Sequence, residues 1–414
     1  MLKIFSTMNF YYFLSPSNTS RTCSINLNLT DENLKIELLF LLPLRITSEE
    51  WDTEKQRPKN IYLKKHKVLN AKLDKLKIFL TERIKERIMK KKIISQKVLI
   101  SHIKKYFCQK EIEHQKDDLL FYVKEYIEKK NGLICNSTMK RYKVFLHLLE
   151  RFEGYVSKRI SIESVNSDFV RNFLLFGKKE EYCESTIHRT IYFVRTILNF
   201  AARKGIRTYS EELVVKKTAH LKNVITLSEQ ELNKIEELKV PKALQDAKKW
   251  LIISCYTGQR ISDFMDFSKE QLQFIDGKPY LSFFQKKTKK HILLPLHPNI
   301  KKIMEQSEDD FPKHLSPQIY NRQIKEIAKL SGLTEILRTR KKRGFRSRME
   351  NVEKWEVMTS HIGRRSFATN FYGKIPTPLL IRATGHSTEQ MFLNYINHQQ
   401  QVILLGEHFE RLAG

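Results

Sequence analysis

The stretch Thr359–Tyr395 reads TSHIGRRSFATNFYGKIPTPLLIRATGHSTEQMFLNY, and it sets two histidines and three arginines among apolar residues. Ser360 is a suitable N-cap for a helix that opens the stretch. On that helix His361 and Arg364, three residues apart, share one face and can converge on one anionic group. The sequence therefore predicts an anion site at the start of a helix.

The end of the same stretch pairs a histidine with a tyrosine. Ser387 or Thr388 can cap a last short helix that carries Tyr395, and His386 comes just before these caps. On one continuous helix, the spacing of nine positions from His386 to Tyr395 would give a rotation of about 180° and a rise of roughly 13 Å. If both side chains serve one pocket, His386 must lie in a turn outside the helix.

The overall charge points to a polyanionic partner. The chain has 414 residues, with Lys+Arg 75 against Asp+Glu 46 and a net charge of +29. Such an excess of cations is typical of nucleic-acid binding, and a hydrophobic fraction of 41% is enough for the cores of two or three domains.

The longest apolar run, Ile36 to Leu42, is too short to span a bilayer, and Met1 to Leu14 lacks the cleavage site of a signal peptide.

The cysteines and carboxylates give no sign of a metal or a disulfide framework. The five cysteines lie far apart with no C-x-x-C pair, which fits a reducing compartment. No carboxylate cluster has the spacing of metal ligands, so a metal-dependent nuclease is disfavoured. We therefore expect no metal and no cofactor.

The N-terminal region predicts a small sheet followed by a basic helix. Strand-like segments cover Asn9–Leu14, Cys23–Leu29 and Lys35–Leu41, with turn residues between them. Apolar residues then recur at spacings of three and four from Leu69 to Ile88, within a region crowded with lysine and arginine. This cationic helix face is either a DNA-tracking arm or an ordinary solvated surface.

From about 117 to 204 the pattern is helical throughout and predicts a four-helix bundle. Ser137, Asp168 and Ser185 are the expected N-terminal residues of its last three helices. A linker over 205–226 then leads to Ser228, which opens a new helix with a capping box. The cations of the bundle that we select as candidate phosphate contacts are Lys140, Arg141 and Arg189.

Two basic groups upstream of the opening stretch are candidates for the same anion site. Arg260 follows a Thr-Gly break at a helix start, where it can reach into a cleft, and Asp263 could orient it through a salt bridge. Two strand-like segments, Tyr280–Gln285 and His291–Leu296, flank a lysine-rich turn and predict a hairpin with a basic tip. By itself such a turn is more often a solvated surface than a site.

A run of basic residues precedes the opening stretch. Arg338–Arg348 reads RTRKKRGFRSR, with seven basic residues in eleven. The run is either a solvated loop or a hairpin that tracks phosphates. The candidate DNA contacts in it are Arg340, Lys341, Lys342 and Arg343.

Taken together, H-x-x-R at 361–364, Gly-His at 385–386, and a tyrosine nine residues later resemble the C-terminal signature of the tyrosine recombinases, the phage-integrase family. T-G-Q-R around Arg260 is similar to the family's first arginine motif. The resemblance implies that Arg260 and Arg364 bind a DNA phosphate while His361 and His386 donate hydrogen bonds or protons. It also implies that Tyr395 is the nucleophile that forms a 3′-phosphotyrosyl bond.

The resemblance further implies a catalytic acid in the lysine turn. Lys287, before Thr288, fits the family pattern best and would protonate the leaving 5′ oxygen, while Lys286 and Lys289 remain open. After Tyr395 an amphipathic tail extends over 402–412; it either docks on its own domain or, as such tails commonly do in the family, inserts into a neighbouring protomer. The covalent mechanism needs neither metal nor ATP.

The expected fold is multidomain and mainly α. Its parts are an arm-binding-like module with a small sheet and a basic linker helix at 1–110, a helical-bundle core-binding domain at 111–210, and a mixed α/β catalytic domain with a small sheet and a tail helix at 225–414. The resemblance implies a site-specific integrase of a bacterial mobile element, which acts on double-stranded DNA as a tetramer in the cytoplasm at the nucleoid. Type IB topoisomerase activity and a catalytically silent DNA-binding regulator are the alternatives.

Overall fold

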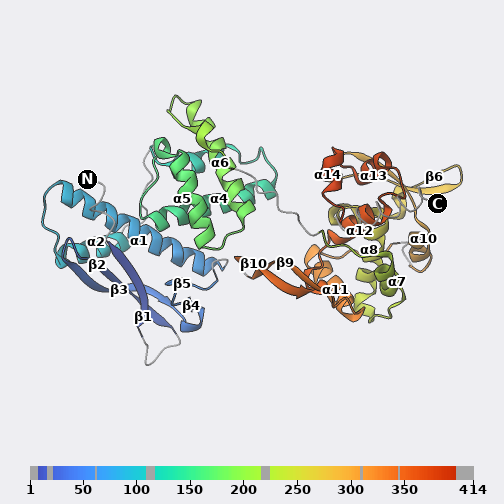
Figure 1. Ribbon diagram of the computed structural model, residues 1–414, viewed down its shortest axis with the longest axis horizontal. Helices are drawn as coiled ribbons and strands as arrows, with labels where there is room; N and C mark the ends of the chain where they lie inside the picture. Colours follow the sequence, from blue (N-terminus) through green and yellow to red (C-terminus); the bar gives the residue numbers. More distant parts are fainter. Residues whose placement is uncertain are drawn as a thin grey trace, which may run out of the picture. The chain divides into compact units, whose positions relative to one another are not determined.

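The computed structural model describes residues 8–15, 22–60, 63–108, 117–215, 224–307, 311–343 and 346–397. It is mainly helical with small antiparallel sheets, as the sequence predicts (Figure 1). The chain divides into two compact units, one formed by Met1–Thr218 with Lys342–Arg348 and the other by Ala219–Lys341 with Met349–Gly414. Among the described residues, no helix has the length and hydrophobicity that a membrane crossing requires.

The first unit begins with a three-stranded antiparallel sheet. Its strands are β1 (Asn9–Ser15), β2 (Cys23–Asp31) and β3 (Ile36–Ile46), in the order β1-β2-β3, which confirms the three predicted strands. Along β3 buried and exposed residues alternate, because one face of the sheet packs on the core and the other meets solvent. A short pair, β4 (Trp51–Asp52) and β5 (Arg57–Pro58), follows.

Two helices cover this sheet. The long helix α1 (Lys64–Met89) buries the predicted apolar stripe and exposes many of its lysines, and α2 (Gln96–Cys108) packs against it (Figure 1). The same α1 also packs on the bundle through Asp74, which is 3% exposed. The Asp74 carboxylate accepts hydrogen bonds from Arg57 at 2.7 Å and from Arg151 at 2.6 Å. A buried ion triad therefore joins the sheet module to the bundle.

Four helices form the bundle: α3 (Leu119–Lys129), α4 (Asn136–Val156), α5 (Ser167–Lys179) and α6 (Glu184–Ala202). Aromatic and aliphatic side chains from all four fill one core.

The first residues of three bundle helices differ slightly from the prediction. Asn166, rather than Asp168, caps α5, because its side-chain oxygen accepts from the backbone N–H groups of Asp168 and Phe169. Helices α4 and α6 begin one residue earlier than Ser137 and Ser185. These shifts are within the usual uncertainty of helix ends.

The second unit is organised around a buried helix. Helix α7 (Glu229–Glu237) begins at Ser228 with the predicted capping box. Helix α8 (Lys242–Thr257) is the centre, in contact with α7, α10 (Pro298–Glu305), α11 (Pro317–Leu330) and α12 (Ile362–Phe371). Figure 1 shows α8 and α12 side by side. Gly363 allows this close approach, because a Cβ at that position would collide with Ser254 of α8.

Two further small sheets follow: the first lies within the second unit, whereas Lys342–Arg348 of the second belong to the first unit. Strands β6 (Leu272–Ile275), β7 (Lys278–Phe284) and β8 (His291–Pro295) form an antiparallel sheet, which confirms the predicted hairpin around the lysine turn. The basic run at 338–348 lies on the paired strands β9 (Ile336–Arg343) and β10 (Arg346–Glu353), which agrees with the strands of the hairpin alternative, while its phosphate-tracking role stays a prediction.

Three short helices carry the Thr359–Tyr395 stretch, and two details differ from the prediction. Helix α12 begins at Ile362, with His361 rather than Ser360 at its N-cap position. Helices α13 (Thr377–Thr384) and α14 (Glu389–Leu393) follow, and Thr388 caps α14. Tyr395 lies in the turn just after α14 and not on it, with its N–H donating to the Phe392 carbonyl at 2.8 Å. The tail predicted over 402–412 is outside the described residues.

Candidate functional site

Arg364 is the most buried of the candidate residues, at 1% exposure. Its Nη1 donates to the Gly258 carbonyl at 2.9 Å, and its Nη2 donates to the Thr384 carbonyl at 2.7 Å. Its Nε is buried with no partner in the described part of the chain. Burial, followed by the charge of Arg260, lowers the pKa of Arg364 to about 10, so the side chain remains a cation at neutral pH.

His386 lies outside any helix, directly after Gly385, as the spacing argument predicts. Its Nε2 is 3.0 Å from Nη2 of Arg364, and its Nδ1 is 2.8 Å from the Thr384 hydroxyl. Burial, followed by the charges of Arg364, Arg260 and Lys290, lowers the pKa of His386 to about 3. The imidazole is therefore neutral at physiological pH.

Tyr395 lies beside His386 and Arg364. The Tyr395 and His386 rings have centroids 4.8 Å apart, and the Arg364 guanidinium lies 5.5 Å from the Tyr395 ring centroid. Thr369 of α12 holds the segment, because its hydroxyl is 3.5 Å from the Tyr395 carbonyl and accepts from the Asn397 N–H at 3.3 Å. The half-buried phenol is thus placed beside two of the predicted partners within one chain.

Arg260 is half-buried at the N-cap position of α9 (Ile261–Phe264). Its Nη1 donates to Oε1 of Gln285 at 3.1 Å. The expected salt bridge with Asp263 is wrong: both residues are described, and they form no ion pair. The Asp263 carboxylate instead accepts from the backbone N–H of Lys286 at 2.9 Å, so Asp263 holds the lysine turn rather than the arginine.

The lysines of the turn have different surroundings. Lys286 pairs with Asp266, and the ammonium of Lys290 donates to the His386 carbonyl at 3.1 Å. Lys289 has a positive φ of 56°. Lys287 is exposed at the centre of the turn, without a hydrogen bond or ion pair to any described residue, and its charge reaches His361. Of the three candidates Lys286 is paired, whereas the ammonium groups of Lys287 and Lys289 are both exposed with no partner among the described residues; of these two, the charge of Lys287 is among the causes that lower the pKa of His361.

His361 lies at the start of α12 with an exposed edge. Desolvation of its ring, followed by the charges of Arg365, Arg364, Arg260 and Lys287, lowers its pKa. His361 is therefore mainly neutral at pH 7 and can donate one hydrogen bond to an anion.

The structure brings the six predicted residues into one strongly cationic region of the second unit. Such a cluster of guanidinium, ammonium and imidazole groups stabilises the charge that builds up on oxygens around a phosphorus atom under attack. A phenol at the edge of the cluster supplies a nucleophile once it loses its proton. In the described part of the chain, no group of three or more His, Cys, Asp or Glu side chains could hold a metal ion.

Sequence reasoning missed the polar residues that support this cluster. Gln259 and Gln285 are fully buried, and so is Thr384. Their partners lie between 2 and 124 residues away along the chain, so no local pattern identifies them. The only available signal was position, because Gln259 precedes Arg260 and Gln285 begins the lysine turn.

The candidate DNA contacts outside the cluster are mostly exposed. Lys140 and Arg141 are exposed on α4 and Arg189 on α6, while Arg340 is exposed on β9. Lys341 is half-buried and pairs with Glu356, which ties it to the protein surface. The side chains of Lys342 and Arg343 lie outside the described part of the structure.

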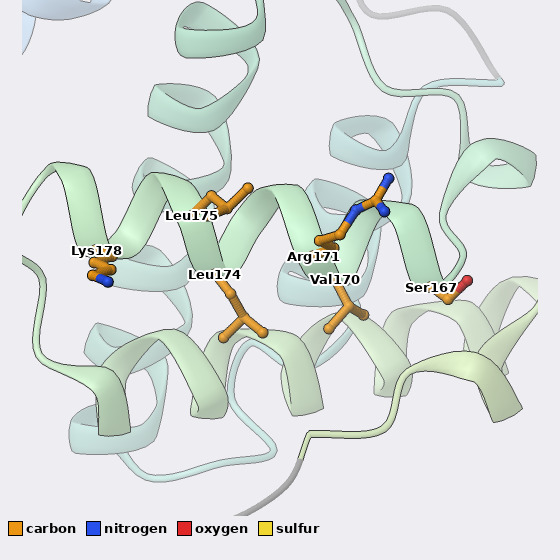
Figure 2. Close-up of a pocket in the computed structure, with 6 residues that line it drawn as sticks. All are labelled: Ser167, Val170, Arg171, Leu174, Leu175 and Lys178. Carbon is orange, nitrogen blue, oxygen red and sulfur yellow. The ribbon is translucent and has the colours of Figure 1, made fainter.

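A separate depression of about 420 Å³ lies on α5 of the first unit and does not include any of the six residues. Figure 2 shows Val170 and Leu174 pointing toward a neighbouring helix, while Arg171 and Leu175 point away from it. The depression is lined by three aliphatic side chains, two cations and a serine, and it includes no carboxylate, histidine or cysteine. It does not provide chemistry comparable to that of the cationic cluster.

Two family models match the chain. The model of the phage integrase SAM-like domain matches residues 118–213, and that of the phage integrase family matches residues 226–402. The first covers the helical bundle and the second covers the cationic cluster with all six predicted residues. A search of curated proteins found no match.

Several solved structures are similar in fold. The Tn1549 transposon integrase in complex with a circular intermediate DNA matches with a TM-score of 0.50 at 16% identity, covering 68% of this chain and 96% of that chain. A lambda integrase tetramer bound to a Holliday junction matches with a TM-score of 0.49 at 17% identity, covering 71% and 88%. At such identities the likeness concerns the fold alone.

Proposed function

The chain belongs to the phage integrase family of tyrosine recombinases, and we propose that it is a site-specific DNA recombinase whose nucleophile is Tyr395. An enzyme of this family breaks and rejoins DNA. The observation that best supports the assignment of the nucleophile is the position of the Tyr395 ring. Its centroid lies 4.8 Å from the centroid of the His386 ring and 5.5 Å from the guanidinium carbon of Arg364.

In the proposed reaction the Tyr395 oxygen attacks a DNA phosphorus. A bond forms between this oxygen and phosphorus, and the bond from phosphorus to the 5′ oxygen breaks. The Lys287 ammonium gives its proton to the leaving 5′ oxygen, while Arg260 and Arg364 stabilise the non-bridging oxygens. The 3′-phosphotyrosyl product retains the energy of the broken bond, so a 5′ hydroxyl can reverse the step without nucleotide hydrolysis.

The neutral histidines define a further part of the mechanism. A tyrosine hydroxyl has a pKa near 10 in water and is a weak nucleophile until it ionises. His361, with a lowered pKa and an exposed edge, can accept the phenol proton or donate to a phosphate oxygen. His386 contacts Tyr395 from the buried side and holds Arg364 in place.

The proposed partner is double-stranded DNA. Exchange between two duplexes involves four strands, and each chain has one Tyr395, so a complete exchange needs four copies. We assign the candidate cations on α4, α6 and β9 to phosphate contacts. We also assign a DNA site to the module at 1–110, in addition to the DNA contacts of the bundle at 111–210 and of the catalytic domain at 225–414. The tail would join neighbouring copies. The place of action is that of the target DNA, for which we propose the bacterial cytoplasm.

The direct test is a covalent adduct. Nicked duplexes that tile the DNA on both sides of the gene are incubated with the purified chain in EDTA, and protein–DNA adducts that resist SDS are resolved on gels. We expect wild type to trap one duplex and Tyr395→Phe to trap none, with Tyr372→Phe as the matched control. Peptide mass spectrometry should place the phosphodiester on Tyr395.

The two alternatives give different outcomes in the same assay. A type IB topoisomerase would relax supercoiled plasmid without a specific site. A catalytically silent regulator would bind one duplex without an adduct. An undiminished adduct from Tyr395→Phe would disprove the assignment of the nucleophile.

A further inference from the structure

Gln285 is completely buried where β7 meets the lysine turn, and all four hydrogen-bonding positions of its side chain are occupied. Its Oε1 accepts from Nη1 of Arg260 at 3.1 Å and from the Thr288 hydroxyl at 2.5 Å. Its Nε2 donates to Oε1 of Gln259 at 2.9 Å and to the Thr384 carbonyl at 3.0 Å. A primary amide is the uncharged side chain that supplies two donors and two acceptors, so this site selects glutamine chemically.

The orientation of this amide is fixed by its partners. A guanidinium can only donate, so Arg260 must face the oxygen of Gln285. A backbone carbonyl can only accept, so Thr384 must face the nitrogen. Rotating the amide by 180° would break both bonds in a buried position, where unpaired polar groups are costly.

Gln285 also connects the two arginines of the site. The Thr384 carbonyl that accepts from Gln285 accepts from Nη2 of Arg364 as well, at 2.7 Å. Arg260, Gln285, the Thr384 carbonyl and Arg364 are therefore joined by three consecutive hydrogen bonds. Both phosphate-binding cations share one rigid support.

The lysine turn is held by the same residue. The backbone N–H of Gln285 donates to the Lys290 carbonyl at 2.9 Å, and the Gln285 carbonyl accepts from the Lys289 N–H at 2.8 Å. The Thr288 hydroxyl closes the turn from inside through its bond to the amide oxygen. Lys287 lies between these attachment points, so the position of its backbone depends on Gln285.

We propose that Gln285 is a positioning residue that aligns the Lys287 ammonium with the Arg260 guanidinium, so that the proton donor faces the leaving oxygen when the phosphate is bound. The inference rests on the proposed function. Because Gln285 has no exposed surface, it acts through Arg260 and through the turn that carries Lys287 rather than by its own contact with DNA.

Changing the leaving atom of the substrate distinguishes the alignment of the Lys287 ammonium from a general contribution of Gln285 to the structure of the site. In a 5′-bridging phosphorothiolate, sulfur replaces the leaving oxygen, and attack by Tyr395 breaks a phosphorus–sulfur bond. A thiol has a pKa of about 8.5, so the thiolate leaves without a proton donor. A variant with a misplaced Lys287 should therefore recover on the sulfur substrate, whereas a variant with a damaged phosphate site should not.

The experiment compares three variants on nicked duplexes of the trapped sequence, with oxygen or sulfur as the leaving atom. We expect Gln285→Met to cleave the oxygen substrate about 100-fold more slowly than wild type, because a displacement near 1 Å costs that much. Thr288→Val, which removes one hydrogen bond from a half-buried side chain, should cost about tenfold. Both losses should shrink at least several-fold on the sulfur substrate. The exposed Gln273→Ala, on the same sheet, should match wild type on both.

Two results would overturn the inference. One is an equal loss of cleavage rate by Gln285→Met on both substrates. The other is cleavage of the oxygen substrate by Gln285→Met at the wild-type rate. If Gln285→Met fails to fold, as judged by thermal melting and DNA binding, Thr288→Val decides by the same criteria. Failure of the proposed function is distinct, because wild type itself would then form no Tyr395-dependent adduct on either substrate.

Discussion

Nη2 of Arg364 lies 3.0 Å from Nε2 of His386, and this contact fixes the protonation of the histidine. A guanidinium only donates, so Nε2 accepts and the ring proton is on Nδ1. Nδ1 then donates to the Thr384 hydroxyl at 2.8 Å, and that hydroxyl donates to the Leu380 carbonyl at 2.7 Å. A chain of three hydrogen bonds thus runs from Arg364 to the backbone of α13, and a protonated His386 would break its first link.

The buried neutral state of His386 predicts a pH dependence of stability. Its pKa is about 3 in the folded chain, whereas an unfolded histidine titrates near pH 6.5. Between these values the unfolded state binds one more proton, so the free energy of unfolding falls as pH decreases, by up to about 1.4 kcal/mol per pH unit. His386→Gln lacks this ionisation. Its urea midpoint should therefore depend less on pH between 6.5 and 4 than that of wild type.

The matched control for this prediction is His314→Gln, which changes a mainly exposed histidine of the same unit. It should follow the pH dependence of wild type. Parallel curves for wild type and His386→Gln would contradict the neutral assignment of His386.

The two arginines should differ in their contribution to stability although they share a proposed role. Arg364→Lys removes the buried donor of the Gly258 carbonyl and of His386 and one of the two donors of the Thr384 carbonyl, so it should lower the free energy of unfolding by about 2–4 kcal/mol. Arg260→Lys loses one bond at a half-buried position and should cost about 1 kcal/mol or less. Both should slow adduct formation at least about 100-fold, because fork geometry toward phosphate is lost.

Urea unfolding and adduct kinetics on the same preparations test this pair. Equal losses of stability would mean that the burial difference between the two arginines has no energetic consequence. Normal cleavage by either variant would remove that arginine from the proposed mechanism.

The sequence was sufficient to predict a structural feature where the spacing of the residues allowed only one conformation. A spacing of nine positions from His386 to Tyr395 excludes a common helix face, so a turn at His386 followed once both residues were assigned to one site. The capping box at Ser228 and the apolar stripe of α1 were also predictable, because each depends only on residues that are close together in the sequence. The partner of Arg260 was not, because Asp263 and Gln285 are both plausible neighbours and only the folded hairpin decides between them. Buried amides such as Gln259 and Gln285 have no periodic signal at all.

Glu153 of the bundle predicts the opposite pH dependence. Burial, against the lowering effect of the Ile160 N–H, raises the pKa of Glu153 to about 8, whereas an unfolded glutamate titrates near pH 4.3. Between these values the folded state binds one more proton, so the stability falls as pH rises. Glu153→Gln keeps the acceptor for Ile160, which lies at 3.0 Å, and removes the ionisation.

We therefore expect the stability of Glu153→Gln relative to wild type to increase from pH 5 to pH 8, by at most about 1.4 kcal/mol per pH unit. Guanidinium titrations at several pH values provide the measurement. The exposed Glu163→Gln in the same unit should show no such trend. A constant difference between Glu153→Gln and wild type would mean that Glu153 is ionised in the folded chain.

Gly385 has a left-handed backbone conformation and lies directly against the side chain of Gln285. Its φ is +68°, and a Cβ at this position would lie 2.5 Å from Oε1 of Gln285. Gly385→Ala should therefore cost the left-handed backbone penalty of about 1 kcal/mol and, in addition, displace the amide that holds Arg260. Gly277→Ala is the matched control, because its φ is +71° and its Cβ would meet no atom within 4 Å. We expect both variants to lose the backbone cost in thermal melts, with a further loss for Gly385→Ala, and slower adduct formation only for Gly385→Ala. If both variants cleave at the wild-type rate, displacement of Gln285 does not reach the reacting groups.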